Sequence, residues 1–354
     1  MRIAAFTKYG SMAASTRQRL IQYLPHLAAA GIEVEHNPLL PDEYVRGVAT
    51  GQGYPRRRIL SAYLHRFRQL VAGTDADLVW IYAELFPYLP GAFERLAFRS
   101  GKPVVYDCDD AFFHGYDAHP DPKVRRLLGR KLEPLLRGAA AACVGNAYLQ
   151  GYAARFCERT MILPTVVDTG VYGAAPASGR PRPVTIGWIG SPSTWPYMRP
   201  ILPLLRELAQ SRGIRIRIVG AGPAARADAF PGLELIEWSE ETEVDEVRAL
   251  DIGLMPLPDD IWARGKCGYK LLQYMACALP VVASPVGING EIVVPGENGL
   301  LPTNETEWRE ALLRLIDDPA LRQAFGTAGR RRVEERYSLA VHAPRFIRLL
   351  KSIA

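Results

Sequence analysis

The sequence predicts an α/β protein built from two doubly wound parallel-sheet domains that face each other across a cleft. Apolar, β-branched runs alternate with helical periodicity along the chain, which is the pattern of parallel strands joined by helices. The 354 residues suffice for two ordinary cores. A stretch rich in Pro, Gly and Ala at residues 171–183 interrupts the alternation, and the same pattern then restarts.

The elements follow in order. In the first domain, residues 1–175, we expect strands at residues 3–6, 34–35, 78–82, 104–106 and 140–144 and helices at 15–30 and 57–72. In the second domain, residues 176–339, we expect strands at 185–189, 214–219, 233–238, 252–255 and 281–283 and helices at 198–211, 244–250 and 269–278. An amphipathic helix is expected near the end of the chain.

Composition narrows the function classes. The net charge is +6, and the excess of basic residues lies in the first half, which suits a phosphorylated ligand, an anionic lipid or nucleic acid. No zinc-finger spacing, RNA-binding aromatic signature or basic arm supports nucleic acid. The five cysteines are widely spaced and indicate reduced thiols. Without a signal peptide or membrane-spanning run, we expect a cytoplasmic protein.

The segment from Arg264 to Leu301 has the features of a phosphate-binding unit. Gly268 precedes a helical run whose amino-terminal end favours an anion, and Lys270 adds a full charge in the first turn. A short buried strand at residues 281–283 follows, and SPVGING at its carboxyl end can present bare backbone amides.

These residues resemble the family 4 (group 1) retaining glycosyltransferases, which have the GT-B fold of two Rossmann-like domains. The run M-A-C-A-L-P-V-V-A-S from Met275 matches the family's M-A-x-G-x-P-V-V-A-S motif. Two positions depart from it, because Gln273 and Gly265 stand where members carry a pair of Glu residues. The amide of Gln273 can still bond a ribose hydroxyl. A branch of the family places a diphosphate-binding Lys where Lys270 stands.

The resemblance implies a nucleotide-sugar donor site in the second domain. IGWIGSPST matches the family's first strand and Gly-rich turn but lacks the usual basic pair after it, so Lys270 and Lys266 are expected to bind the diphosphate. The expected donor-binding residues are Gly190, Ser191, Gly222, Trp238, Lys266, Gly268, Lys270, Gln273, Gly287, Ile288, Asn289 and Glu291. Edge packing of Trp238 and capping by Glu291 are the structural alternatives.

The first domain carries the candidates for the acceptor side. Gly10 and Ser11 follow the opening strand, and Ser15 with Gln18 forms a capping-box pattern. Arg17 and Arg19 lie in the first helical turn, where a cation opposes the helix dipole, so an anionic ligand would explain them. Two solvated surface arginines are the alternative.

Acidic residues follow two further strands. Asp109 aligns with a family His and is expected to contact the transferred sugar or the acceptor hydroxyl, while Asp107 and Asp110 are expected to cap the loop. Mg²⁺ is an alternative for these carboxylates, but the family generally requires no metal. Glu84 lies at another strand end, with simple solvation as its alternative.

Together these observations and the resemblance predict transfer of a sugar, with retention of configuration, from a UDP- or GDP-sugar to a carbohydrate or lipid-linked acceptor. The expected role is in cell-surface polysaccharide or glycolipid biosynthesis. The expected catalytic residues are Asp109, Lys270 and Arg17, and the acceptor-side residues are Gly10, Ser11, Glu84 and Asp110. No metal or other cofactor is expected. The resemblance also implies that the terminal helix, residues 340–354, packs back on the first domain. A sugar-nucleotide epimerase and a non-catalytic scaffold are the alternatives.

The helix expected near residues 57–72 is a candidate for contact with a membrane surface. It combines an apolar stripe with a cluster of arginines and can lie on an anionic membrane at its inner face. Covering a sheet with the same stripe is the simpler interpretation.

Overall fold

The structure is a computed structural model that describes residues 1–173 and 182–354. The chain divides into two compact units. The first comprises Met1–Thr165, Arg264–Cys267 and Leu339–Ala354, and the second comprises Val166–Ala263 and Gly268–Ser338. The predicted domain boundary at residues 175 and 176 lies outside the described residues. None of the helices in the described ranges is long and apolar enough to cross a membrane.

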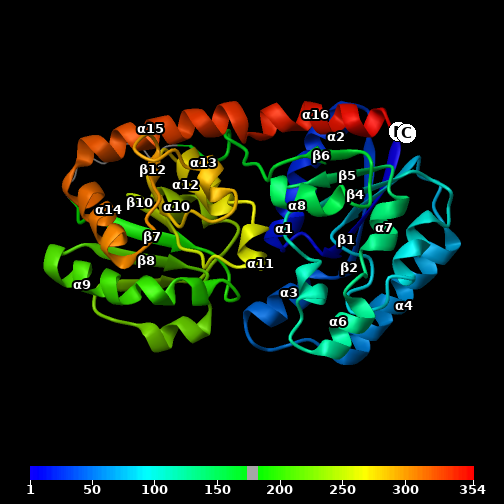
Figure 1. The fold of residues 1–354 in the computed structure, drawn as a ribbon, viewed down its shortest axis with the longest axis horizontal. Coiled ribbons are helices and arrows are strands. Elements are labelled where there is room, and N and C mark those ends of the chain that lie inside the picture. The colour runs from blue at the N-terminus through cyan, green and yellow to red at the C-terminus, as the bar shows by residue number, and fades with distance from the viewer. Residues whose placement is uncertain (174–181) are drawn as a thin grey trace. The chain divides into compact units, whose positions relative to one another are not determined.

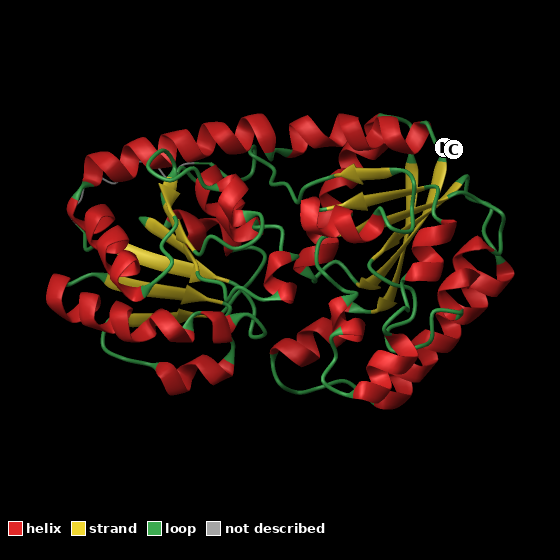
Figure 2. Cartoon of the chain, viewed as in Figure 1, coloured by secondary structure: helices red, strands yellow, loops and turns green. Residues whose placement is uncertain are grey.

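The first unit is built on a parallel sheet, whose strands are among the yellow arrows in Figure 2. Its six strands have the order β2-β1-β3-β4-β5-β6. Its strands are β1 (Arg2–Tyr9), β2 (Glu33–Leu40), β3 (Leu78–Tyr82), β4 (Val104–Cys108), β5 (Ala141–Val144) and β6 (Thr160–Ile162). All residues of β3, β4 and β5 are buried, as expected for central strands covered on both faces.

Helices cover both faces of this sheet. They are α1 (Ala14–Arg19), α2 (Leu24–Ala29), α3 (Asp42–Ala49), α4 (Arg56–Ala72), α5 (His114–Asp117), α6 (Pro122–Leu128), α7 (Glu133–Gly138), α8 (Ala147–Ala153) and α16 (Leu339–Lys351). The predicted helix 15–30 is divided in two. Pro25, which has no backbone N–H to donate, lies in the first turn of α2, where that loss costs nothing.

Alternate residues of β3 pack against opposite helical layers. Val79 and Ile81 share a core with Leu70 of α4. Trp80 points to the other face, where its ring lies 4.9 Å from that of Phe346 in α16. The last helix of the chain therefore completes the core of the first unit (Figure 1).

The second unit contains a six-stranded parallel sheet with the order β12-β11-β10-β7-β8-β9. Its strands are β7 (Thr185–Ile189), β8 (Arg215–Val219), β9 (Leu233–Ile236), β10 (Ile252–Met255), β11 (Val281–Ala283) and β12 (Gly299–Leu300). Counted from β7, this is the 3-2-1-4-5-6 order of dinucleotide-binding folds.

Two helical layers enclose this sheet. Its helices are α9 (Leu202–Arg212), α10 (Glu243–Arg248), α12 (Tyr269–Ala276), α13 (Asn289–Ile292), α14 (Glu305–Asp317) and α15 (Pro319–Arg336), and α11 (Ile261–Arg264) ends at the first unit's segment. Trp188 of β7 packs in a core with Leu205 of α9. Its neighbour Ile189 packs on the opposite face with Met275 of α12.

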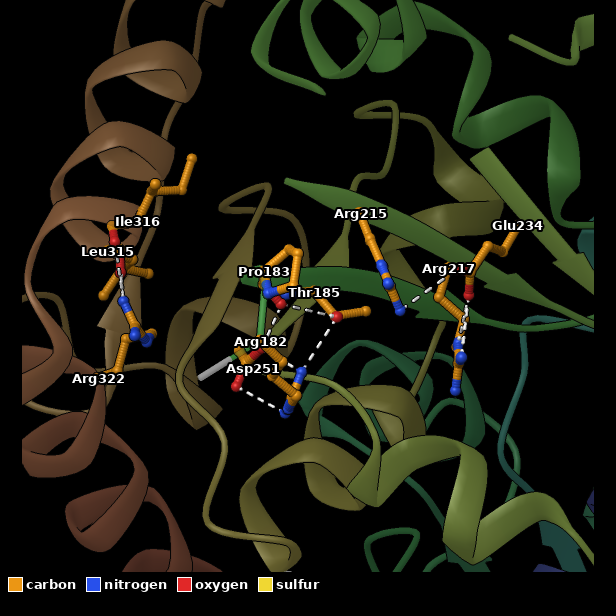
Figure 3. A network of polar contacts seen from close by, with 10 residues as sticks. All are labelled: Arg182, Pro183, Thr185, Arg215, Arg217, Glu234, Asp251, Leu315, Ile316 and Arg322. Atoms are coloured by element: carbon orange, nitrogen blue, oxygen red, sulfur yellow. Dashed lines mark hydrogen bonds and ion pairs between the residues drawn. The ribbon is translucent and has the colours of Figure 1, made fainter. Parts of the chain in front are cut away.

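Ion pairs fix the amino-terminal edge of the second sheet (Figure 3). Arg182 donates to both carboxylate oxygens of Asp251 at 2.8 and 2.9 Å, and the same carboxylate accepts the N–H of Thr185, the first residue of β7, at 2.7 Å. In the middle of β8, Arg217 pairs with Glu234 of β9 at 2.9 Å and with Glu246 of α10 at 3.2 Å.

Candidate functional site

The carboxyl-terminal edge of the second sheet is lined by backbone. The strand order reverses between β7 and β10, and open α/β sheets bind ligands at such a point. Gly190 follows β7 directly, and its N–H donates to the carbonyl of Val219 at 3.0 Å. A Cβ atom on Gly190 would lie 2.2 Å from the ring of Trp188, so only glycine fits.

The loop after β8 lies against the loop after β7. Gly220 and Gly222 have φ angles of 78° and 76°, which favour glycine. A Cβ on Gly220 would lie 2.3 Å from the carbonyl oxygen of Gly190, and one on Gly222 would lie 2.7 Å from Pro192. The predicted donor residues Gly190 and Gly222 therefore belong to one surface with few side chains.

Hydroxyl groups replace the family's basic pair beside this surface. The N–H of Ser191 donates to Oγ1 of Thr194 at 3.2 Å, and the Oγ atoms of Ser191 and Ser193 lie 2.9 Å apart. Ser191 is exposed. The turn thus presents neutral groups that can donate hydrogen bonds to an anion but carry no charge.

A cation and a helix end approach the same strand end. Gly268 forms the N-cap of α12 with a φ angle of 68°, and no side chain caps this helix. Lys270, in the first turn, places its Nζ atom 5.6 Å from the ring centre of Trp188 in β7. The ammonium group and the positive end of the α12 dipole therefore lie near the carboxyl end of β7.

Gln273 and Trp238 meet through a carboxylate that sequence analysis missed. The side-chain amide of Gln273 donates to Oε1 of Glu243 at 2.8 Å and to the hydroxyl of Tyr172 at 2.9 Å. The indole N–H of Trp238 donates to Oε2 of Glu243 at 2.6 Å. Glu243 and Gln273 are both buried. The sequence did not mark Glu243 as a site residue, because it lies in the first turn of α10, where acidic residues are common.

The turn after β11 lies next to Gly268. Gly287 has a φ angle of 54°, Ile288 is buried, and the side chain of Glu291 is exposed on α13. Asn289 is also buried, and its amide nitrogen donates to the carbonyl of Ser284 at 3.1 Å. Its Oδ1 atom has no hydrogen-bond partner among the described residues and lies 3.7 Å from the position of a Cβ on Gly268.

The loop after β1 in the first unit is held by one carboxylate. Asp42 accepts the Ser11 hydroxyl at 2.9 Å and the N–H of Met12 at 2.8 Å. A Cβ on Gly10 would lie 2.3 Å from this carboxylate, so the loop packs closely around it. Arg17 is half-buried and donates to the carbonyl of Met12 at 2.8 Å, and it thereby supports the same loop.

Glu84 is buried, which corrects the alternative of a solvated loop residue. Its carboxylate lies 3.5 Å from the Nζ atoms of both Lys8 and Lys131 and accepts the Tyr116 hydroxyl at 2.6 Å. Lys131 also pairs with the buried Glu94. Because β3 lies beside β1 on the side opposite to β2, Glu84 marks the point where this sheet reverses its strand order.

Arg19 and Asp107 form a buried ion pair, so the alternative of a solvated arginine and the prediction of a loop-capping aspartate are both wrong. Arg19 Nε and Nη2 donate to Oδ1 of Asp107 at 3.0 and 2.5 Å, and the indole of Trp80 donates to the other oxygen at 3.3 Å. Burial raises the pKa of Asp107 to about 6, and Arg19 opposes this shift.

Asp109 and Asp110 point to different partners. The hydroxyl of Tyr82 donates to Asp109, and burial raises the pKa of this carboxyl. Asp110 pairs with Lys266 at 3.6 Å, and Lys266 belongs to the segment of the first unit at 264–267. In the described ranges, no three His, Cys, Asp or Glu side chains are arranged to hold a metal ion.

Asn146 fixes that segment within the first unit. It caps α8 by accepting the N–H of Leu149 at 2.9 Å, and its amide nitrogen donates to the carbonyls of Gly265 at 3.0 Å and Lys266 at 3.1 Å. A Cβ on Gly265 would lie 2.5 Å from that of Ala111. The position where the family carries its first Glu is therefore tightly packed and has no room for a side chain.

Residues 184–318 match the family model described as Glycosyl transferases group 1. The chain is 38% identical over 95 residues to alpha-maltose-1-phosphate synthase of Mycolicibacterium smegmatis, covering 25% of this chain and 24% of that protein. It is 31% identical over 157 residues to D-inositol 3-phosphate glycosyltransferase of Kineococcus radiotolerans, covering 37% and 35%. The matched stretches thus span about a third or less of these relatives.

Solved structures match along nearly the whole chain. Sucrose-phosphate synthase from Thermosynechococcus elongatus superposes with a TM-score of 0.69 at 18% identity, covering 99% of this chain and 98% of that one. HepE from Anabaena in complex with UDP-glucose gives 0.70 at 14% identity, covering 99% of both chains. The predicted GT-B fold class and the resemblance to group 1 glycosyltransferases are confirmed.

Proposed function

We propose that this protein is a retaining glycosyltransferase that moves a sugar from a nucleotide-sugar donor to a carbohydrate or lipid-linked acceptor. One observation carries the proposal. The glycine-lined carboxyl edge of β7 and β8, with Lys270 and the amino-terminal end of α12 beside it, lies inside the segment that matches group 1 glycosyltransferases. In this proposal residues 176–339 bind the donor, and residues 1–175 with the helix 340–354 bind the acceptor.

The donor's diphosphate would bind where backbone and cation meet. Bare glycine backbone admits phosphates at close range, and Lys270 with the α12 dipole compensates their charge. HepE was solved with UDP-glucose, and a relative from Corynebacterium glutamicum is described as GDP-mannose-dependent, so both UDP- and GDP-sugars are candidates. Gln273 and the turn at 287–291 would approach the ribose and the sugar.

The chemistry requires stabilisation of a leaving group. Negative charge grows on the departing diphosphate as the glycosidic bond breaks, and Lys270 stabilises that charge more in the transition state than in the bound donor. Asp109, held by the Tyr82 hydroxyl, would contact the transferred sugar or the acceptor hydroxyl. In this proposal no metal or further cofactor takes part.

The acceptor would bind at the carboxyl edge of the first sheet. The loop of Gly10 and Ser11, supported by Arg17, lies at the end of β1, and Glu84 lies at the end of β3. Asp110 lies at the end of β4. We place the reaction at the cytoplasmic face of the membrane, in assembly of cell-surface polysaccharide or glycolipid.

Donor binding is tested by thermal unfolding of the purified protein with UDP-, GDP-, ADP- and dTDP-sugars. A ligand at 100 times its Kd should stabilise the protein by about 2.7 kcal/mol. Lys270→Ala should abolish the rise in unfolding temperature caused by the donor. Lys123→Ala, which changes an exposed residue, should keep that rise. No shift with any donor would contradict the proposal and favour a scaffold.

Turnover with the donor that binds separates the remaining enzyme classes. Nuclear magnetic resonance of the product should show the anomeric configuration of the donor, with sugar released only slowly to water when no acceptor is added. Conversion of the nucleotide sugar to its epimer without an acceptor would instead identify an epimerase. An inverted linkage would refute retention and leave glycosyl transfer intact.

A further inference from the structure

The outer face of α4 is apolar and exposed. Leu60, Leu64, Phe67 and Val71 are 63%, 49%, 40% and 38% exposed. Their spacing of four, three and four residues places them within a sector of about 60° on a helix of 3.6 residues per turn. They form one continuous stripe, which we call the α4 stripe.

The inner face of the same helix contains one buried charge among apolar residues, which is unusual for a surface helix. Arg66 is buried, and its Nη2 atom donates to the carbonyls of Asn37 at 2.6 Å and Thr7 at 3.2 Å. Leu70 is also buried in the core. Leu70 and Tyr63 cover the sheet, as the simpler interpretation expects, whereas the four residues of the α4 stripe are left exposed.

The charges on α4 are all positive. The helix contains Arg56, Arg57, Arg58, Arg66 and Arg68 and no Asp or Glu. The four arginines other than Arg66 are exposed, and among the described residues none of these four takes part in an ion pair. Arg57 and Arg68 lie about 50–70° from the centre of the α4 stripe, on the same side of it.

We propose that the α4 stripe docks on the surface of an anionic lipid bilayer. Leucine, phenylalanine and valine side chains would enter the boundary between headgroups and acyl chains, while Arg57 and Arg68 bind lipid phosphates. A bilayer fits this face better than a soluble acidic protein, because the stripe is linear and the cations along one side of it can reach the headgroups. Binding would be peripheral, with the axis of α4 parallel to the membrane surface.

Flotation of the purified full-length protein with lipid vesicles tests this surface. Vesicles of phosphatidylcholine with phosphatidylglycerol should bind it about tenfold better than phosphatidylcholine alone, and 0.5 M NaCl should reduce the difference. The variant Leu60→Ser/Leu64→Ser/Phe67→Ser should bind about a hundredfold more weakly. Arg57→Gln/Arg68→Gln should lose the preference for the anionic lipid.

Matched controls separate docking from folding and from glycosyl transfer. Val341→Ser changes an exposed apolar residue of α16, on the opposite face of the first sheet, and should bind vesicles as the unchanged protein does. Every variant should retain its thermal unfolding temperature and its donor-induced shift, so a failure here is distinct from a failure of donor binding. The proposal is overturned if anionic vesicles are not bound, if the triple variant binds equally well, or if light scattering shows that the α4 stripe instead pairs two copies of the chain.

Discussion

The carboxyl-terminal edges of the two sheets differ in what lines them, which is glycine backbone in the second unit and buried charged side chains in the first. In the second unit the edge consists of glycines whose loops touch backbone to backbone, as Gly220 does with Gly190. In the first unit the edge consists of buried charges, including the Arg19–Asp107 pair and Glu84 between two lysines. A backbone edge suits a ligand that brings its own charge, whereas prearranged side chains suit a neutral ligand that must be oriented by hydrogen bonds.

The largest effect should come from breaking a buried charge in the first unit. Arg19→Met leaves Asp107 without its cation in the core, and the free energy of unfolding should fall by about 4 kcal/mol. Urea denaturation measures this loss. The double variant Arg19→Met/Asp107→Leu should recover most of this loss, because neither charge of the pair then remains in the core. A loss of under about 1 kcal/mol in the single variant would mean that the pair is solvated.

Adding a methyl group at Gly220 should destabilise the second unit. Gly220→Ala places a Cβ 2.3 Å from the Gly190 carbonyl at a positive φ angle, so we expect a loss of about 3 kcal/mol. Gly213→Ala is the matched control. Its φ angle is also positive, but no atom lies within 4 Å of the added Cβ, and it should cost only about 1 kcal/mol. Equal losses from thermal unfolding of the two variants would refute the close backbone contact.

The smallest effect concerns Glu243, an acidic group buried beside the glycine edge. Gln273→Glu sets a second carboxylate against Glu243 and removes a donated hydrogen bond, so stability at pH 8 should fall by about 2 kcal/mol. At pH 5 the loss should shrink, because the pair can then share a proton. Exchange of the two residues in Glu243→Gln/Gln273→Glu should restore stability at both pH values. A single variant that is unaffected at pH 8 would place the two side chains apart.

This pair also accounts for a departure from the family motif. The motif's Glu would meet the carboxylate of Glu243 at the position of Gln273, and the neutral amide avoids that repulsion while donating to it. The contact joins residues 30 apart in the sequence. A single sequence therefore reveals the substitution but not its reason.

Local signals predicted the elements that depend on backbone chemistry. Strands β7 to β11 of the second sheet and the start of α12 after Gly268 follow from β-branched runs and from glycine's access to a positive φ angle. The capping box of Ser15 and Gln18 does not form. The N-cap is Ala13, without any side-chain capping bond, because tertiary contacts of Gln18 and Arg19 fix the helix instead.

Contacts between distant residues account for what the sequence did not reveal. Arg19 is separated from Asp107 by 88 positions, and Lys131 is separated from Glu94 by 37. Each residue in isolation has the pattern of a surface charge, and only the tertiary fold brings the partners together. Short strands such as β6 and β12 were missed for a related reason, since pairing with a neighbouring strand defines them more than their own two or three residues do.

The place of α16 in the first unit has a consequence for synthesis on the ribosome. The sheet of that unit is complete at Ile162, but the face carrying Trp80 lacks Phe346 until the whole second unit has been synthesised. At about 5–20 residues per second, the delay is on the order of ten seconds or more. During that interval the nascent chain exposes an indole and its apolar neighbours, so a chaperone that holds apolar surface should associate with it until the terminal helix emerges.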